Sequence, residues 1–242
     1  MEKSCLCYEG KAKKVFASDN EEVYIVQYKD DATAFNGIKK GIIENKGIIN
    51  NRMSNHIFKA LESQGIKTHY IKELNDRETA VRKVDIIPVE VIIRNVAAGS
   101  FAKRYGIEEG RSLICPTLEY SYKNDDLGDP LTNEYHLISL GITTKAELTA
   151  ISKLAFKIND ILSEFFKGMD IMLVDFKLEF GRCTALGGEI ILADEISPDT
   201  CRLWDIQTGK RLDKDRFRRD MGDVEEGYIE ILQRLGLEIS KG

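Results

Sequence analysis

Within residues 173–180, LVDFKLEF, apolar and polar side chains alternate strictly from Val174 to Phe180. Successive side chains of a strand point to opposite faces of its sheet. The segment therefore predicts a strand whose apolar face carries Val174, Phe176, Leu178 and Phe180. Its polar face would carry Asp175, Lys177 and Glu179. A second apolar run follows at 190–193, and the Gly187-Gly188 pair between the two runs predicts a hairpin.

The remaining apolar patterns predict strands early in the chain and helices later. Strands are expected at 8–16, 22–28, 68–74 and 80–93. Helices are expected at 50–63, 100–105, 144–168 and 213–235. The 144–168 helix begins with a capping box, in which Glu147 follows Thr144 by three residues. This order favours an α+β fold, and a boundary near residue 85 would separate a β-rich lobe, 1–85, from a larger α+β lobe, 86–242.

Composition narrows the class of protein. The chain has 242 residues, 31% of them charged, and a formal net charge of −5. An acidic balance argues against a protein that binds nucleic acid by neutralising many phosphates. No apolar run approaches the roughly 20 residues of a membrane helix, and the N-terminus lacks the apolar core of a secretory signal. Five cysteines without paired spacing do not form a disulfide or zinc pattern. We therefore expect a cytoplasmic protein.

Three segments carry candidate chemistry, and the first is rich in lysine. In YEGKAKKVF, residues 8–16, Gly10 and Ala12 would allow close approach of the backbone, while Lys11 and Lys13 supply positive charge. Such a hairpin could lie over a triphosphate. It is not a Walker A loop, because the glycine–lysine spacing and the following helix are missing. On this pattern alone, ordinary exposed lysines explain the segment better than a phosphate site does.

The second segment is an apolar strand that delivers Arg94 and then opens a helix at Gly99-Ser100. A helix N-terminus with a nearby guanidinium suits phosphate or carboxylate. The alternative is that Ser100 only caps the helix and Arg94 pairs with a neighbouring acid.

The third segment joins the carboxylates of the predicted hairpin to DEISPDTCRLWD, residues 194–205. Carboxylates gathered at the end of a strand repel one another unless a cation lies between them. Mg²⁺ takes one or two carboxylates together with phosphate oxygens. Arg202 would then balance charge that develops on a transferred phosphoryl group. The alternative is a salt-bridged loop.

Taken together, these segments predict a Mg²⁺–nucleotide enzyme with a second anionic substrate. Neither a serine nor a cysteine nucleophile motif is evident. The histidines add little, since His56 lies in a predicted helix and His69 and His136 have no partners at metal-ligand spacing.

Four segments in order resemble the phosphoribosylaminoimidazole-succinocarboxamide synthase family over nearly the whole chain. They are residues 8–13, 93–100, 173–181 and 194–205. The resemblance implies a two-lobed fold related to ATP-grasp enzymes, with ATP bound between the lobes, and a homodimer. It also implies the reaction, in which ATP, carboxyaminoimidazole ribonucleotide and L-aspartate give the succinocarboxamide, ADP and phosphate through an acyl phosphate.

The resemblance further implies site residues. Nucleotide contacts would be Gly10, Lys11, Ala12, Lys13, Val15, Ile86, Glu90 and Lys123. Mg²⁺ would be held by Glu179 and Asp194. Catalytic roles would fall to Lys177, Asp199 and Arg202. Ribonucleotide contacts would be Arg94, Gly99, Ser100 and Arg202, with a further substrate contact at Asn36, where some family members have Asp. Two alternatives stay open: a small-molecule kinase without the joining step, and a nucleotide-binding regulator without turnover.

Overall fold

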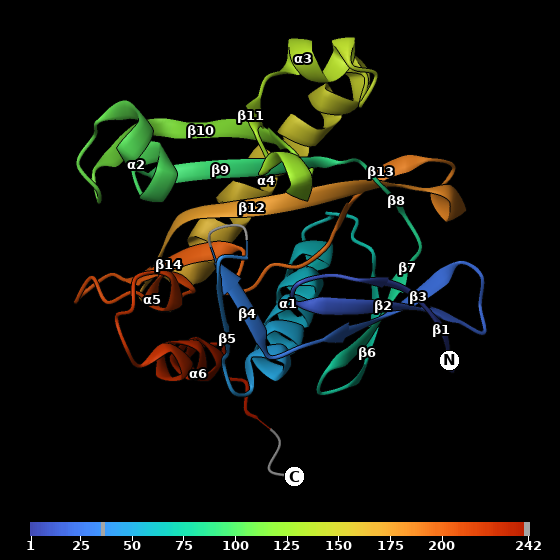
Figure 1. Cartoon of the computed structure of the whole chain (residues 1–242), viewed down its shortest axis with the longest axis horizontal. Coiled ribbons are helices and arrows are strands. Elements are labelled where there is room, and N and C mark those ends of the chain that lie inside the picture. Colours follow the sequence, from blue (N-terminus) through green and yellow to red (C-terminus); the bar gives the residue numbers. More distant parts are fainter. Residues whose placement is uncertain (35–36, 240–242) are drawn as a thin grey trace.

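The computed structural model describes residues 1–34 and 37–239, which form two antiparallel sheets with helices packed against them (Figure 1). The smaller sheet has the strand order β1-β2-β3-β7-β6. Its strands are β1 (Lys3–Glu9), β2 (Lys13–Ser18), β3 (Val23–Tyr28), β6 (Tyr70–Asn75) and β7 (Glu78–Arg82). A separate two-stranded hairpin consists of β4 (Asp31–Ala34) and β5 (Lys39–Ile42).

The larger sheet is organised around one long strand, β12 (Ile171–Cys183). It pairs with four other strands, β8 (Asp85–Ile86), β9 (Val89–Val96), β13 (Glu189–Ala193) and β14 (Cys201–Asp205). Two further strands extend the sheet beyond β9: β10 (Ser112–Tyr122) and β11 (Leu131–Thr132). All residues of the predicted 173–180 strand thus lie on one central strand, and the Gly187-Gly188 hairpin to β13 is confirmed.

Six α-helices and two short 3-10 helices, Asp125–Leu127 and Thr184–Leu186, complete the chain that the structure describes. The α-helices are α1 (Lys46–Ser63), α2 (Gly99–Tyr105), α3 (Glu134–Ser139), α4 (Lys145–Lys167), α5 (Asp215–Arg218) and α6 (Val224–Arg234). Figure 1 shows α4 crossing one face of the larger sheet, while α1 lies along the smaller sheet. Helix α6 packs against α1, where Tyr228 and Leu232 share a buried cluster with Ile49. None of the described helices is long and apolar enough to cross a membrane.

The main core lies between α4 and the larger sheet. Apolar side chains of α4 at Leu148, Ile151 and Ile158 pack in one buried cluster with Phe176 and Leu178 of β12. The predicted capping box is present, because the Thr144 hydroxyl accepts from the Glu147 backbone N–H and the Glu147 carboxylate accepts from that of Thr144. The helix therefore begins where the sequence predicts.

Three predicted elements are interrupted. The expected strand 8–16 breaks at residues 10–12, where the backbone turns and separates β1 from β2. The expected strand 80–93 divides into β7, β8 and β9. The expected helix 213–235 divides into α5 and α6, because Gly222 and Asp223 have left-handed φ values of 73° and 47°. Left-handed residues cannot continue a right-handed helix.

A β-bulge corrects the predicted apolar face of β12. Leu173 pairs with Leu203 and Asp175 with Arg202, so the register shifts between Leu173 and Asp175. Such a bulge changes which side chains face the core. Leu173 therefore packs in the main core with Phe176, whereas Val174 packs in a separate small cluster with Trp204. The prediction that Val174 shares a face with Phe176 is wrong.

Candidate active site

Two adjoining cavities open where the smaller sheet, the β12–β13 hairpin and the start of α5 meet. The first, of about 450 Å³, is lined by Lys11, Lys13, Lys123, Lys177 and Lys214, and we call it the lysine-lined cavity. The second, of about 320 Å³, is lined by Arg94, Arg202 and Arg218, and we call it the arginine-lined cavity. Both volumes suit small-molecule ligands. Seven residues line both cavities: Lys11, Thr33, Glu90, Lys177, Asp199, Thr200 and Lys214.

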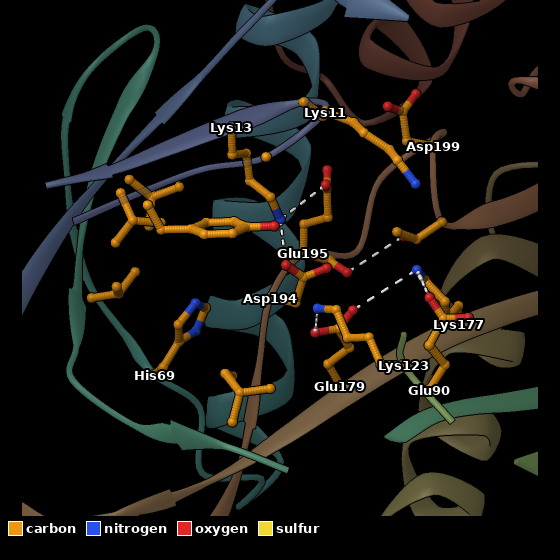
Figure 2. Close-up of a pocket in the computed structure, with 18 of the residues that line it drawn as sticks. Lys11, Lys13, His69, Glu90, Lys123, Lys177, Glu179, Asp194, Glu195 and Asp199 are labelled. Atoms are coloured by element: carbon orange, nitrogen blue, oxygen red, sulfur yellow. Dashed lines mark hydrogen bonds and ion pairs between the residues drawn. The ribbon is translucent and has the colours of Figure 1, made fainter. Parts of the chain in front are cut away.

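Two carboxylates lie in the lysine-lined cavity, of which Glu179 is buried and Asp194 is half-buried. Glu179 of β12 pairs in register with Ala193 of β13, which places the next residue, Asp194, beside it. Asp194 has a left-handed φ of 61°, a conformation uncommon outside glycine. Strain of this kind is often found at functional sites. Figure 2 shows both carboxylates in the middle of the cavity, with lysine side chains converging on them.

Each carboxylate is paired with a lysine. Lys13 forms an ion pair with Asp194 and a second one, at 3.0 Å, with Glu195. Lys123 pairs with Glu179, and Lys177 Nζ lies 3.8 Å from Glu179 Oε1 while it also pairs with Glu90 (Figure 2). The predicted nucleotide and metal residues are therefore brought together in one place.

The pKa values of the two carboxylates are shifted in opposite directions. Burial alone would raise the pKa of Asp194, but the nearby Lys13, Lys123 and Lys177 outweigh it and lower that pKa. Burial and the neighbouring Asp194 charge together raise the pKa of Glu179. A second negative charge in a buried site favours the protonated acid. A cation bound between Glu179 and Asp194 would therefore reduce their mutual repulsion and stabilise both ionised carboxylates.

The chemistry of this pair fits a magnesium ion. The described residues contain no group of three or more histidine, cysteine, aspartate or glutamate side chains arranged for a metal. Mg²⁺ does not need such a cage, because it binds one or two carboxylates together with phosphate oxygens and water. Glu179 and Asp194, two mutually repelling carboxylates that face a cavity, meet this requirement.

The β1–β2 turn forms one wall of the same cavity. Gly10 N–H donates to the Lys13 carbonyl at 2.8 Å, which closes the turn, and Lys11 reaches Asp125 at 2.7 Å. Gly10, Ala12 and Val15, which the sequence analysis expects to contact the nucleotide, also line the cavity. Farther along, its wall becomes apolar, with Val15, Tyr24, Val26, Val81, Val84 and Ile86.

The arginine-lined cavity is built on a row of cross-strand partners. Asp175 of β12 lies opposite Arg94 of β9 on one side and opposite Arg202 of β14 on the other. Its Oδ2 accepts from Arg94 Nη1 at 2.6 Å and from Arg202 Nη1 at 2.8 Å. Arg94 Nε also donates to Glu119 at 2.6 Å, and Arg202 Nε donates to Asp215 at 2.9 Å. Both guanidinium groups are thus held in fixed orientations.

Gly99 and Ser100 contact these arginines but do not line either cavity. Ser100 Oγ accepts a long hydrogen bond, 3.4 Å, from Arg94 Nη2. Gly99 has a φ of 53°, and a Cβ at this position would lie 2.3 Å from Arg202 Nη2. Only glycine therefore allows Arg202 to occupy its place.

Asp199 lies between the two cavities, where it is held by residues that the sequence did not single out. Its Oδ2 accepts from Lys46 Nζ at 2.8 Å and its Oδ1 from the Tyr228 hydroxyl at 2.6 Å. Lys214 is a more distant partner, at 3.4 Å. Burial would raise the pKa of Asp199, but Lys46 and Lys214 lower it. Burial, with help from Lys46, lowers the pKa of Lys214.

Other residues of the site also lacked a sequence signal. Asp175 was predicted on the polar face of β12 without an assigned role, and Lys214 and His69 were not predicted as site residues. The sequence shows only that these residues are charged or aromatic. Which residues lie next to them is decided by the fold. The predicted substrate contact at Asn36 lies outside the described residues.

Comparison with known proteins gives one consistent result. The family model described as SAICAR synthetase matches residues 6–235. A phosphoribosylaminoimidazole-succinocarboxamide synthase from Lachnoclostridium phytofermentans is 63% identical over 231 residues, which cover 96% of this chain and 97% of that protein. The crystal structure of the enzyme of that name from Ehrlichia chaffeensis has a TM-score of 0.94 at 51% identity and covers 97% of this chain and 100% of its own. A SAICAR synthetase solved in complex with ADP has a TM-score of 0.92 at 48% identity and covers 96% of this chain and 99% of its own. The chain therefore belongs to the SAICAR synthetase family.

Proposed function

We propose that the protein is an ATP-dependent carbon–nitrogen ligase of de novo purine biosynthesis. It would join L-aspartate to carboxyaminoimidazole ribonucleotide and release the succinocarboxamide (SAICAR), ADP and phosphate. Family membership over almost the full chain supports this reaction. The observation that carries it is the pair of adjoining cavities, which share residues at their junction. Such an arrangement suits transfer of a phosphoryl group from one bound molecule to another.

The lysine-lined cavity is the proposed ATP site. A related structure contains ADP, and the cavity combines an apolar end with a lysine-rich end. Lys11, Lys13 and Lys123 would bind the phosphates beneath the β1–β2 turn, and Ile86 would flank the base. Glu90, which lines both cavities, would hold Lys177 at their junction. Glu179 and Asp194 would hold Mg²⁺, which supplies positive charge beside the phosphates when bound.

The arginine-lined cavity is the proposed ribonucleotide site. Arg94 and Arg202 present planar forks that match a phosphate, and they are already fixed by Asp175. Gly99 and Ser100 would act by holding these two arginines in place. The carboxylate of the substrate would then point towards the junction, where Lys177 lies.

The chemistry requires activation of that carboxylate, which is a poor electrophile because of its charge. Transfer of the γ-phosphoryl group to a carboxylate oxygen would give an acyl phosphate and ADP. The neutral amine of L-aspartate would attack the acyl carbon, and the bond between that carbon and the phosphate oxygen would break. The proton lost by the amine would pass to the departing phosphate. Asp199, held ionised at the junction, is placed to accept hydrogen bonds from that amine. Catalysis by positioning and charge needs no protein nucleophile.

Two features of the whole molecule belong to this proposal. The segments 1–85 and 86–242 would act as two lobes that enclose ATP, and the active form would be a cytoplasmic homodimer. Light scattering coupled to size-exclusion chromatography would measure the mass of the assembly, and a monomer that turns over at full rate would contradict the dimer.

The reaction is tested by ADP release in the presence of ATP, Mg²⁺, carboxyaminoimidazole ribonucleotide and L-aspartate, with one component omitted at a time. We expect release only when all four are present, with one succinocarboxamide formed for each ADP. Release at full rate without L-aspartate would instead indicate a kinase. ATP binding without any release would indicate a nucleotide-binding protein and would overturn the proposed reaction.

A further inference from the structure

One polar side chain in the lysine-lined cavity is not used by the proposed reaction. His69 lines this cavity, yet its residue is only 5% exposed and its Nδ1 has no hydrogen-bond partner among the described residues. Figure 2 shows its ring beside the cavity, apart from the lysine–carboxylate cluster. A buried ring nitrogen without a partner is costly to maintain. Such an atom calls for an explanation, and a ligand in the cavity would supply one.

The backbone holds this histidine in a fixed place. His69 N–H donates to the Leu192 carbonyl at 2.8 Å, and the His69 carbonyl accepts from Arg82 N–H at 2.6 Å. The residue therefore bridges the smaller sheet and the segment that leads to Asp194. Its ring also packs edge-on against Phe58, with the ring centroids 5.2 Å apart. The imidazole is thus positioned before any ligand binds.

The neighbours of His69 indicate which part of a nucleotide it meets. The apolar side chains of Val26, Val81, Val84 and Ile86 line the same cavity and suit a flat heteroaromatic base. The charged groups at the other end already form lysine–carboxylate pairs that suit phosphates and a metal. Burial lowers the pKa of His69 to about 3, so its imidazole is neutral near pH 7. A neutral imidazole has one N–H donor and one acceptor nitrogen.

We propose that His69 is a specificity-determining residue that accepts a hydrogen bond from the 6-amino group of the purine base. This inference deepens the proposed function and rests on ATP binding in the lysine-lined cavity. The base would lie at the apolar end of the cavity. Its 6-amino group would donate a hydrogen bond to the ring nitrogen of His69 that has no partner among the described residues. A 6-oxo base could be met by the other tautomer, so the diagnostic ligand is one that lacks the 6-substituent.

The test compares two nucleotides on two proteins. The nucleotides are ATP and purine riboside 5′-triphosphate, which has hydrogen at position 6, and the proteins are the unmodified chain and His69→Leu. Affinities are measured by calorimetry with Mg²⁺ and without the other substrates. We expect the unmodified protein to prefer ATP by roughly three- to tenfold, the size of one hydrogen bond. His69→Leu should lose that preference and bind the analogue as before, so the two changes are not additive.

Several outcomes would overturn the proposal. Equal loss of both affinities in His69→Leu would place the histidine against another part of the nucleotide or indicate a structural defect. An unmodified protein that binds both nucleotides equally would also overturn it, and this half of the test does not depend on the variant folding. His56→Leu is the matched control, because His56 packs against Phe165 with centroids 5.9 Å apart and does not line either cavity. Binding is measured separately from product formation, so failure of the proposed ligation leaves this result interpretable.

Discussion

The two adjoining cavities use positive charge in different ways. In the lysine-lined cavity, Lys123 and Lys177 both lie near one carboxylate, Glu179, and each ammonium is a point charge on a flexible stem. In the arginine-lined cavity, two guanidinium groups share Asp175, and each is held by a second acid as well. Flexible lysine side chains can follow a phosphoryl group that moves during the reaction. Fixed guanidinium groups suit a phosphate that stays bound throughout. The difference between the cavities therefore matches the different roles of the two proposed phosphate-bearing substrates.

The largest expected effect comes from neutralising the carboxylates of the lysine-lined cavity. Glu179→Gln and Asp194→Asn each remove a proposed Mg²⁺ ligand and leave lysines without counter-charge. We expect kcat/KM to fall by about 10²- to 10³-fold, the range typical of losing a key electrostatic group at a transition state. Steady-state kinetics over a series of Mg²⁺ concentrations would measure this. Wild-type turnover at limiting Mg²⁺ in both variants would refute the metal assignment, and Glu189→Gln, an exposed acid on β13, is the control.

A smaller effect is expected from Gly99→Ala, which tests the rigidity of the arginine-lined cavity. The new Cβ would displace the Arg202 guanidinium, 2.3 Å away. We expect KM for the ribonucleotide to rise by about tenfold, which corresponds to about 1.4 kcal/mol, while the affinity for ATP is unchanged. Gly106→Ala is a close control, because Gly106 has a similar φ of 62° but a Cβ there would meet nothing within 4 Å. Equal changes in both variants would mean that backbone strain, rather than the position of Arg202, is responsible.

The smallest effect on turnover, but a measurable one on stability, concerns Asp213 beneath the arginine-lined cavity. Burial and the neighbouring Asp215 raise the pKa of Asp213 from 3.8 to about 7. The folded state then binds a proton more tightly than the unfolded state, so this residue's contribution to stability is lost as pH rises from about 4 to about 7. We expect urea unfolding of Asp213→Asn to show a weaker loss of stability over this range than the unmodified protein. Parallel curves for the two proteins would contradict the raised pKa. Asp126→Asn, in the exposed 3-10 helix Asp125–Leu127, serves as the control.

Local sequence signals predicted much of the fold. The alternation in β12 from Phe176 onwards, the glycine pair of its hairpin and the capping box of α4 each involve residues close together in the chain, and all three are present in the structure. The β12 bulge had no such signal, because it depends on how β14 pairs with β12. The break between α5 and α6 was not predicted either, because the apolar pattern of a helix continues across it.

The site shows the same division. Charged residues in short motifs, such as Lys11, Lys13 and Asp194, were identifiable and do line one cavity. The partners that orient Asp199 were not, because Lys46 is 153 residues away and Tyr228 is 29 residues away along the chain. Only the folded chain brings α1 and α6 to the same carboxylate. His69 was missed for a related reason, since its significance lies in the lack of a partner rather than in any pattern around it.

The continuity of β12 sets a length scale for the whole active site. Asp175, which fixes the two arginines, and Glu179, a proposed metal ligand, are four residues apart on one strand. At a rise of about 3.3 Å per residue their backbones are about 13 Å apart, and they face the same side of the sheet. Backbone geometry of this strand therefore fixes the distance between the proposed phosphate site at Arg94 and Arg202 and the proposed metal site at Glu179. An acceptor that is too short could bind at one end without presenting its carboxylate at the other, so selection by length would survive most side-chain substitutions. Deleting a single residue between Asp175 and Glu179 would turn one of these two side chains to the opposite face of the sheet.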